Sequence, residues 1–145
     1  HYDHFGGTKA LVELTGASGV KKTLIQRAWE AAQAVSGVTN VYVLTDDDRI
    51  ADAAKAFGAE VLMTSSGARN GSERCAEGLA QLDSDPDVVI NLQGDAPLTP
   101  AWFVEALIGA MDQTTQMATP VVKCDAETTT PDGSRTVASG ATRAA

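Results

Sequence analysis

The chain has 145 residues and carries 11 Lys and Arg against 19 Asp and Glu, a formal net charge of −8 at pH 7. This length corresponds to one domain or part of one, and the 43% hydrophobic content predicts a folded core and argues against a disordered chain. The acidic balance disfavours nucleic acid and anionic membranes as partners, because both reward clustered positive charge. Cys75 and Cys124 form no metal or disulfide framework and no apolar run approaches the roughly 18 residues of a membrane span, so we expect a reduced, cytoplasmic protein.

The first half of the chain predicts helices and strands in alternation. Apolar residues recur at helical spacing over residues 22–35, and a short β-branched run over 41–45 predicts a strand. The run Asp46-Asp47-Asp48 then offers a capping carboxylate to a helix that Gly58 ends, and residues 61–64 predict the next strand.

The second half continues the alternation. A helix is expected over residues 72–82, and the continuous apolar run 88–92 predicts a strand covered on both faces. A further helix is expected from Pro100 to about Asp112, and a last strand over 116–122. Strands alternating with helices predict an α/β fold with a Rossmann-like, doubly wound, mostly parallel sheet.

We expect a partial domain over residues 1–127 and an irregular tail over 128–145. The tail is rich in Thr, Ser, Gly and Ala and has almost nothing bulky to bury.

Ligands of open parallel sheets collect beyond the carboxyl ends of the strands, so polar residues there are the first candidates. Gln93, Gly94 and Asp95 follow the most apolar predicted strand, and a carboxylate beside a glycine suits a hydrated Mg²⁺. The run Asp46-Asp47-Asp48 follows another strand, and a solvated helix start is its favoured interpretation.

Two further segments are candidates for binding anions. Residues 70–74, Asn-Gly-Ser-Glu-Arg, run into a predicted helix start, where unpaired backbone N–H groups favour an anion or a polar ring; helix capping explains Ser72 and Glu73 equally well. The glycine-rich start Phe5-Gly6-Gly7-Thr8-Lys9 offers backbone N–H groups to phosphates, with Lys9 as counter-charge, although it has neither Walker nor GxGxxG spacing.

Several of these motifs together resemble one family. The run VVINLQGDAPL from Val88 resembles the VVNxQGDEPL signature of the 3-deoxy-manno-octulosonate cytidylyltransferases, or CMP-Kdo synthetases. TDDDRI from Thr45 is similar to the family's ATDDxRI, and MT at Met63 followed by NGSERCAE from Asn70 is similar to MTxxxxxSGTERxAE. With LIQRAWE from Leu24, the resemblance covers roughly residues 8 to 125.

The resemblance implies transfer of a cytidylyl group from CTP to 3-deoxy-D-manno-octulosonate, an acidic eight-carbon sugar, with release of pyrophosphate, a step that serves lipopolysaccharide synthesis. Asp95 would bind Mg²⁺ beside the α-phosphate, and Lys9 would belong to the phosphate-binding loop; these two are the expected catalytic residues. The implied nucleotide or sugar contacts are Asn70, Gly71, Ser72, Arg74, Gln93 and Gly94.

The resemblance also implies a truncated chain, without the family's first strand and its C-terminal half. The complete enzyme is expected to be a homodimer, and the fragment alone is expected to be of low stability and doubtful activity, because the absent strand would leave apolar strand edges unpaired.

Three alternatives stay open at the level of the residues. One is another sugar nucleotidyltransferase with a different acceptor, and another is a fragment that binds nothing. The third is a phospho-receiver regulatory domain, with Asp46 and Asp47 as its acidic pair, Asp95 as phosphoacceptor and Lys123 as its late lysine.

Overall fold

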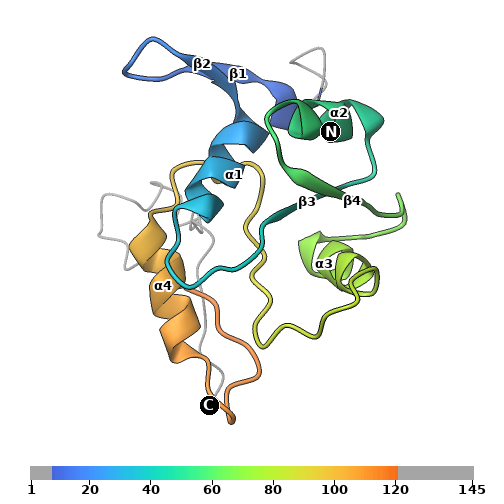
Figure 1. Ribbon diagram of the computed structural model, residues 1–145, viewed down its shortest axis with the longest axis vertical. Coiled ribbons are helices and arrows are strands. Elements are labelled where there is room, and N and C mark those ends of the chain that lie inside the picture. The colour runs from blue at the N-terminus through green and yellow to red at the C-terminus, as the bar shows by residue number, and fades with distance from the viewer. Residues whose placement is uncertain (1–7, 121–145) are drawn as a thin grey trace, which may run out of the picture. The chain divides into compact units, whose positions relative to one another are not determined.

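The computed structural model describes residues 8–120, which divide into two compact units between Ala101 and Trp102. Figure 1 labels the α-helices and strands along the chain. In order, the elements are the 3-10 helix η2 (Lys9–Leu11), β1 (Glu13–Thr15), β2 (Lys21–Thr23), α1 (Leu24–Gln33), β3 (Tyr42–Thr45), α2 (Asp48–Ala56), β4 (Glu60–Met63), α3 (Gly71–Leu79) and α4 (Ala101–Ala110).

The unit β3–α2–β4 is a parallel strand pair with a helical crossover, as the sequence pattern predicts. The strands pair in register from Tyr42 opposite Glu60 to Thr45 opposite Met63. Asp47 caps α2 by accepting a hydrogen bond from the Arg49 backbone N–H at 2.9 Å, so the expected capping carboxylate is confirmed. Gly58, with φ of 90°, follows the end of α2 in a backbone conformation that favours glycine.

Helices cover both faces of this strand pair, which the period-two alternation of a strand explains. Val43 is buried against Ala54 of α2 and Ala59, with side chains of α1 packed around them. The neighbouring Leu44 lies on the opposite face, where Gly78 allows α3 to approach closely. In Figure 1, α2 and α3 accordingly lie on either side of β3 and β4. The observed arrangement confirms the doubly covered α/β class.

The chain before α1 forms a hairpin that the sequence pattern does not predict. β1 and β2 pair antiparallel, and Lys22, expected at the start of a helix, lies in β2. Thr23 instead caps α1, and Arg27 of α1 donates a hydrogen bond to the Leu14 carbonyl at 2.7 Å. Strands of three residues with largely exposed side chains carry too little apolar alternation to be detected.

Two expected strands are not observed. Residues 88–92 are extended without a strand ladder and alternate between half-buried and exposed side chains, with Val89 49% exposed, so the prediction of a deeply buried strand was wrong. A strand requires backbone hydrogen bonds to a neighbour, and no segment within 8–120 provides them here. Residues 116–120 of the last expected strand likewise form no strand. Residues 121 and 122 of that expected strand lie outside the described residues.

The remaining helices agree with the sequence in type and differ at their ends. α3 begins after Asn70, which caps it, and ends at Leu79, before the expected position 82. α4 confirms the expected helix after Pro100, with Val104 buried and Trp102 in edge-to-face contact with Phe103 at 5.5 Å. The expected tail, 128–145, lies outside the described residues.

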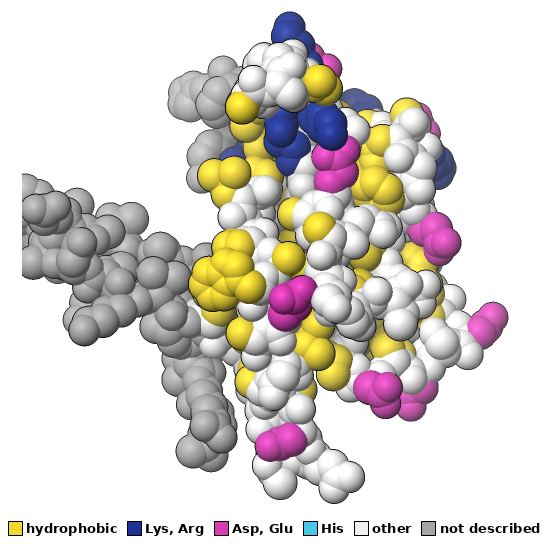
Figure 2. Space-filling model, turned by 60° about the vertical axis from the view of Figure 1, so that its left-hand side comes forward, with side chains coloured by type: hydrophobic (Ala, Val, Ile, Leu, Met, Phe, Trp, Pro, Cys, Tyr) yellow, Lys and Arg dark blue, Asp and Glu magenta, His cyan; other side chains and the backbone are white. Residues whose placement is uncertain are grey.

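The surface in Figure 2 shows Lys and Arg side chains gathered at the upper end of the view, around the β1–β2 hairpin and the start of α1. Basic residues of this part include Lys22, which pairs with Glu30 at 2.7 Å. None of the helices in the described part of the chain has the length and apolar character needed to cross a membrane.

Candidate active site

The two expected catalytic residues, Lys9 and Asp95, are in contact although they lie 86 positions apart in the sequence. The Lys9 ammonium group donates a hydrogen bond to Asp95 Oδ2 at 2.7 Å. Lys9 lies in η2, and its side chain is 39% exposed; Asp95 follows the extended segment 88–92, and its side chain is 49% exposed. The pair is therefore within reach of a solvent-borne ligand.

The start of α3 lies directly against the amides that precede Asp95. A Cβ atom on Gly71 would lie 2.7 Å from Asn91 Nδ2 and would also collide with the amide nitrogen of Gln93. Gln93 in turn donates a hydrogen bond to Asn91 Oδ1 at 2.9 Å. The α3 N-terminus thus forms one polar surface with two neighbouring side-chain amides that come later in the sequence.

Asn70, Ser72 and Arg74 also lie at this end of α3. Asn70 Oδ1 accepts a hydrogen bond from the Glu73 backbone N–H at 2.9 Å, so its oxygen serves the helix cap. Ser72 is exposed in the first turn, and the expected Ser72 cap is supplied by Asn70 instead. Gly94 packs against Ile25, where a Cβ atom would lie 2.9 Å from Cδ1.

Arg74 connects α3 to the residues that follow β3 and β4. Its guanidinium pairs with Asp46 after β3 at 3.0 Å and donates a hydrogen bond to the Thr64 hydroxyl after β4. Only 22% of the Arg74 side chain is exposed. Arg74 therefore holds α3 at the edge of the sheet where the site lies.

Sequence reasoning missed a second cluster, formed by Thr8, Asp47 and Arg49. The Thr8 hydroxyl donates to Asp47 Oδ2 at 3.1 Å, and Arg49 donates to both Asp47 oxygens, at 3.0 and 2.6 Å. The hydrogen bonds from the Arg49 side chain, its backbone N–H and Thr8 hold the pKa of Asp47 well below its usual range. The sequence carried one usable signal, a threonine directly before Lys9, but only the fold brings it to a residue 39 positions away.

The carboxylates of the site limit how Mg²⁺ could bind. No group of three or more His, Cys, Asp or Glu side chains that could hold a metal exists within residues 8–120. Mg²⁺ commonly binds through one or two carboxylates plus substrate phosphates and water, and the half-exposed Asp95 carboxylate fits this mode once its ion pair with Lys9 opens. Asp95 is the residue that would hold the ion.

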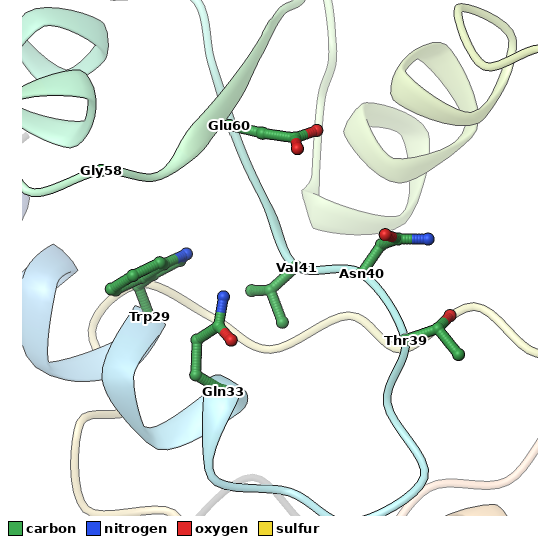
Figure 3. Close-up of a pocket in the computed structure, with 7 residues that line it drawn as sticks. All are labelled: Trp29, Gln33, Thr39, Asn40, Val41, Gly58 and Glu60. Carbon is green, nitrogen blue, oxygen red and sulfur yellow. The ribbon is translucent and has the colours of Figure 1, made fainter.

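The pocket drawn in Figure 3 lies at the other end of the strand pair. Its volume is about 180 Å³, and it is lined by residues that include Trp29, Gln33, Asn40 and Glu60. Asn40 precedes β3 and Glu60 begins β4, whereas Asp46 and Thr64, at the site, follow these strands. The pocket is thus distinct from the candidate active site.

A protein of known structure shares the fold of this chain, and a family model matches most of its length. A solved structure titled CMP:2-keto-3-deoxy-manno-octonic acid synthetase complexed with CTP matches with a TM-score of 0.66 and 34% identity, over 78% of this chain and 44% of that one. The fold is therefore that of the nucleotide-diphospho-sugar transferases. The family model described as "Cytidylyltransferase" matches residues 8–143, and the chain belongs to this family.

Curated relatives carry two related names. A 3-deoxy-manno-octulosonate cytidylyltransferase of Maricaulis maris is 47% identical over 107 residues, which is 72% of this chain and 41% of the relative. An 8-amino-3,8-dideoxy-manno-octulosonate cytidylyltransferase of Shewanella baltica is 44% identical over 93 residues, 63% of this chain and 38% of the relative. The chain thus spans about two fifths of the length of these relatives.

The comparisons support the nucleotidyltransferase interpretation over the phospho-receiver alternative. The residues that the alternative needs also have other partners, since Asp46 pairs with Arg74 and Asp47 caps α2. Lys123, its late lysine, lies outside the described residues.

Proposed function

We propose that this chain is the nucleotide-binding part of an enzyme that transfers a cytidylyl group from CTP to 3-deoxy-D-manno-octulosonate and releases pyrophosphate. The observation that carries the proposal is the Lys9–Asp95 pair at 2.7 Å, which brings the two expected catalytic residues together. The names of the relatives and the CTP bound to the structural neighbour support the nucleotide and the class of acceptor.

The proposed reaction needs positioning and charge neutralisation rather than a covalent intermediate with the protein. The anomeric oxygen of the sugar bonds to the α-phosphorus while the bond to the pyrophosphate oxygen breaks, and the hydroxyl proton passes to water. Lys9 offsets the negative charge of the triphosphate, and backbone N–H groups at the α3 N-terminus add partial positive charge. Mg²⁺ held by Asp95 would supply further neutralisation of the phosphate oxygens.

The side-chain amides of Asn91 and Gln93 would form hydrogen bonds with polar groups of the nucleotide or sugar. Asn91 and Gln93 each present a donor and an acceptor and lie against Gly71. Because Gly71 has no side chain, these amides can lie directly against the start of α3.

The acceptor, the assembly and the location belong to the proposal as well. The Shewanella relatives are named for an 8-amino sugar, so the two acceptors must be compared directly. A homodimer of the complete enzyme and a cytoplasmic location remain predictions.

Isothermal titration of CTP with Mg²⁺ into the chain tests the proposal. Asp95→Ala should weaken binding strongly, whereas Asp52→Ala, which removes an exposed carboxylate from the middle of α2, should not. Equal binding by the wild-type chain and Asp95→Ala would remove the site assignment. Parallel titrations with UTP and ATP test the nucleotide, and preference for either over CTP would contradict a cytidylyltransferase.

A further inference from the structure

Lys9 is flanked by a hydrogen-bonded cluster that no part of the proposed chemistry uses. We propose that Thr8, Asp47 and Arg49 form a clamp that positions Lys9 for the nucleotide phosphates. The inference rests on the proposed function, because it assigns a task to the residues that hold a proposed phosphate ligand.

Hydrogen bonds connect each of the three clamp side chains to the other two. Thr8 Oγ1 donates to Asp47 Oδ2 at 3.1 Å, and Arg49 Nη2 donates both to Thr8 Oγ1 at 2.8 Å and to Asp47 Oδ2 at 2.6 Å. A bidentate pair between guanidinium and carboxylate fixes direction as well as distance. The Thr8 hydroxyl is therefore held by two charged groups at once.

Asp47 connects the clamp to strand β3. The Asp47 backbone N–H donates to Thr45 Oγ1 at 3.1 Å, and Thr45 ends β3 with only 3% of its surface exposed. Asp47 also accepts the Arg49 backbone N–H as the N-cap of α2. Strand, helix start and clamp therefore form one connected unit.

The other end of the clamp is covalently joined to Lys9. Thr8 is the N-cap residue of η2, yet its side chain makes no cap hydrogen bond in that helix and turns to Asp47 instead. Its carbonyl accepts the Leu11 N–H at 2.9 Å, so fixing Thr8 fixes the short helix from which the Lys9 side chain extends to Asp95. The clamp thus sets the position of Lys9 relative to the carboxyl end of β3.

A role in positioning differs from a role in stability alone. If the clamp acts through Lys9, its loss should matter only while Lys9 is present. If it merely stabilises the fold, its loss should weaken binding to the same extent with or without Lys9.

The test is a double-mutant cycle on the binding of CTP with Mg²⁺, measured by isothermal titration. Thr8→Val should weaken binding about tenfold, the usual scale for a lost hydrogen bond to a charged group. Thr8→Val in a Lys9→Gln background should cause little further loss. Thr8→Ser, which keeps the hydroxyl, should restore binding, and circular dichroism checks the fold of each variant.

Thr114→Val is the matched control. The Thr114 hydroxyl donates to the Asp112 carboxylate at 2.7 Å, so the same substitution breaks the same kind of bond in the second unit, and binding should not change. Equal losses from Thr8→Val in both backgrounds, or the absence of rescue by Thr8→Ser, would overturn the clamp.

Failure of the clamp and failure of the proposed role of Lys9 give different binding results. If Lys9→Gln weakens binding and Thr8→Val does not, only the clamp is wrong. If the wild-type chain binds no CTP, or Lys9→Gln has no effect, the proposed role of Lys9 fails and the clamp fails with it. Should Thr8→Val not fold, Arg49→Lys, which keeps the charge and loses the bidentate geometry, replaces it in the cycle.

Discussion

The Lys9 ammonium group lies 2.7 Å from Asp95 Oδ2, so the carboxylate proposed to hold Mg²⁺ is already paired with a cationic side chain. Both side chains are between a third and a half exposed, and exposed ion pairs contribute only about 0–1 kcal/mol to stability. Such a pair can be exchanged at little cost. Arrival of a nucleotide with its metal would let Asp95 move to the metal and Lys9 to a phosphate.

This exchange predicts that Lys9 and a divalent cation compete for Asp95. Lys9→Gln should raise the affinity for Mn²⁺ alone by about two- to fivefold, the range that an exposed pair allows, while weakening the binding of CTP with Mg²⁺. Electron paramagnetic resonance of free Mn²⁺ measures the first effect. Lys55→Gln, at an exposed lysine in the last turn of α2, is the control for net charge. Unchanged or weaker Mn²⁺ binding by Lys9→Gln would contradict the competition.

Gly71→Ala should reduce nucleotide binding with little effect on stability. The new Cβ atom would lie 2.7 Å from Asn91 Nδ2 and would displace the Gln93 amide as well, but both are ends of flexible side chains that can move into solvent. Titration with CTP measures the loss, for which we expect about tenfold. Gly109→Ala in α4 is the control because a Cβ atom there meets nothing within 4 Å. Full binding by Gly71→Ala would exclude these amides from the site.

The elements around the parallel pair could be predicted because their signals are local. The β-branched strand before Asp46, the capping carboxylate Asp47 and the terminating Gly58 lie within one short stretch of chain, and β3, α2 and β4 follow that order. α4 is signalled in the same way, by Pro100 ahead of an apolar run.

The features that the sequence does not predict depend on contacts between residues distant in sequence. Residues 88–92 have the composition of a strand, but the described part of the chain offers them no neighbour, and Val89 remains half exposed. The contact of Thr8 with Asp47 spans 39 positions, and that of Lys9 with Asp95 spans 86. Through the family resemblance the sequence marks Lys9 and Asp95 as catalytic residues, without predicting the contact between them.

Gly78→Ala should destabilise the first unit by about 1–3 kcal/mol, the usual cost of overpacking. Gly78 is buried in α3, and a Cβ atom there would collide with Cδ2 of Leu44 and lie 3.0 Å from its Cγ, in the face that joins α3 to β3. Urea denaturation followed by circular dichroism measures the loss. Leu44→Val shortens the opposing side chain, so Gly78→Ala should cost less in that background. Equal costs in both backgrounds would show that the two residues do not limit each other.

The turn after α4 should carry a carboxyl group that titrates far below its ordinary pKa. Asp112 Oδ1 accepts hydrogen bonds from the Thr114 hydroxyl at 2.7 Å and from the backbone N–H groups of Thr114 and Thr115, both at 2.8 Å. These bonds, led by that of the Thr114 side chain, lower the pKa of Asp112 from 3.8 to about 2. Because the folded pKa is depressed, the charged carboxyl stabilises the turn above pH 3.8, and this contribution is lost as the pH falls towards about 2.

Carboxyl ¹³C NMR should therefore give Asp112 a midpoint near 2 in the wild-type chain. Thr114→Val removes the leading cause and should move the midpoint up towards 3.8, so that the turn loosens at a higher pH. Thr99→Val is the control, because the Thr99 hydroxyl donates to the Ala96 carbonyl at 3.0 Å and reaches no carboxylate. A wild-type midpoint at the ordinary value, or the same midpoint in Thr114→Val, would show that the hydroxyl does not hold this turn in solution.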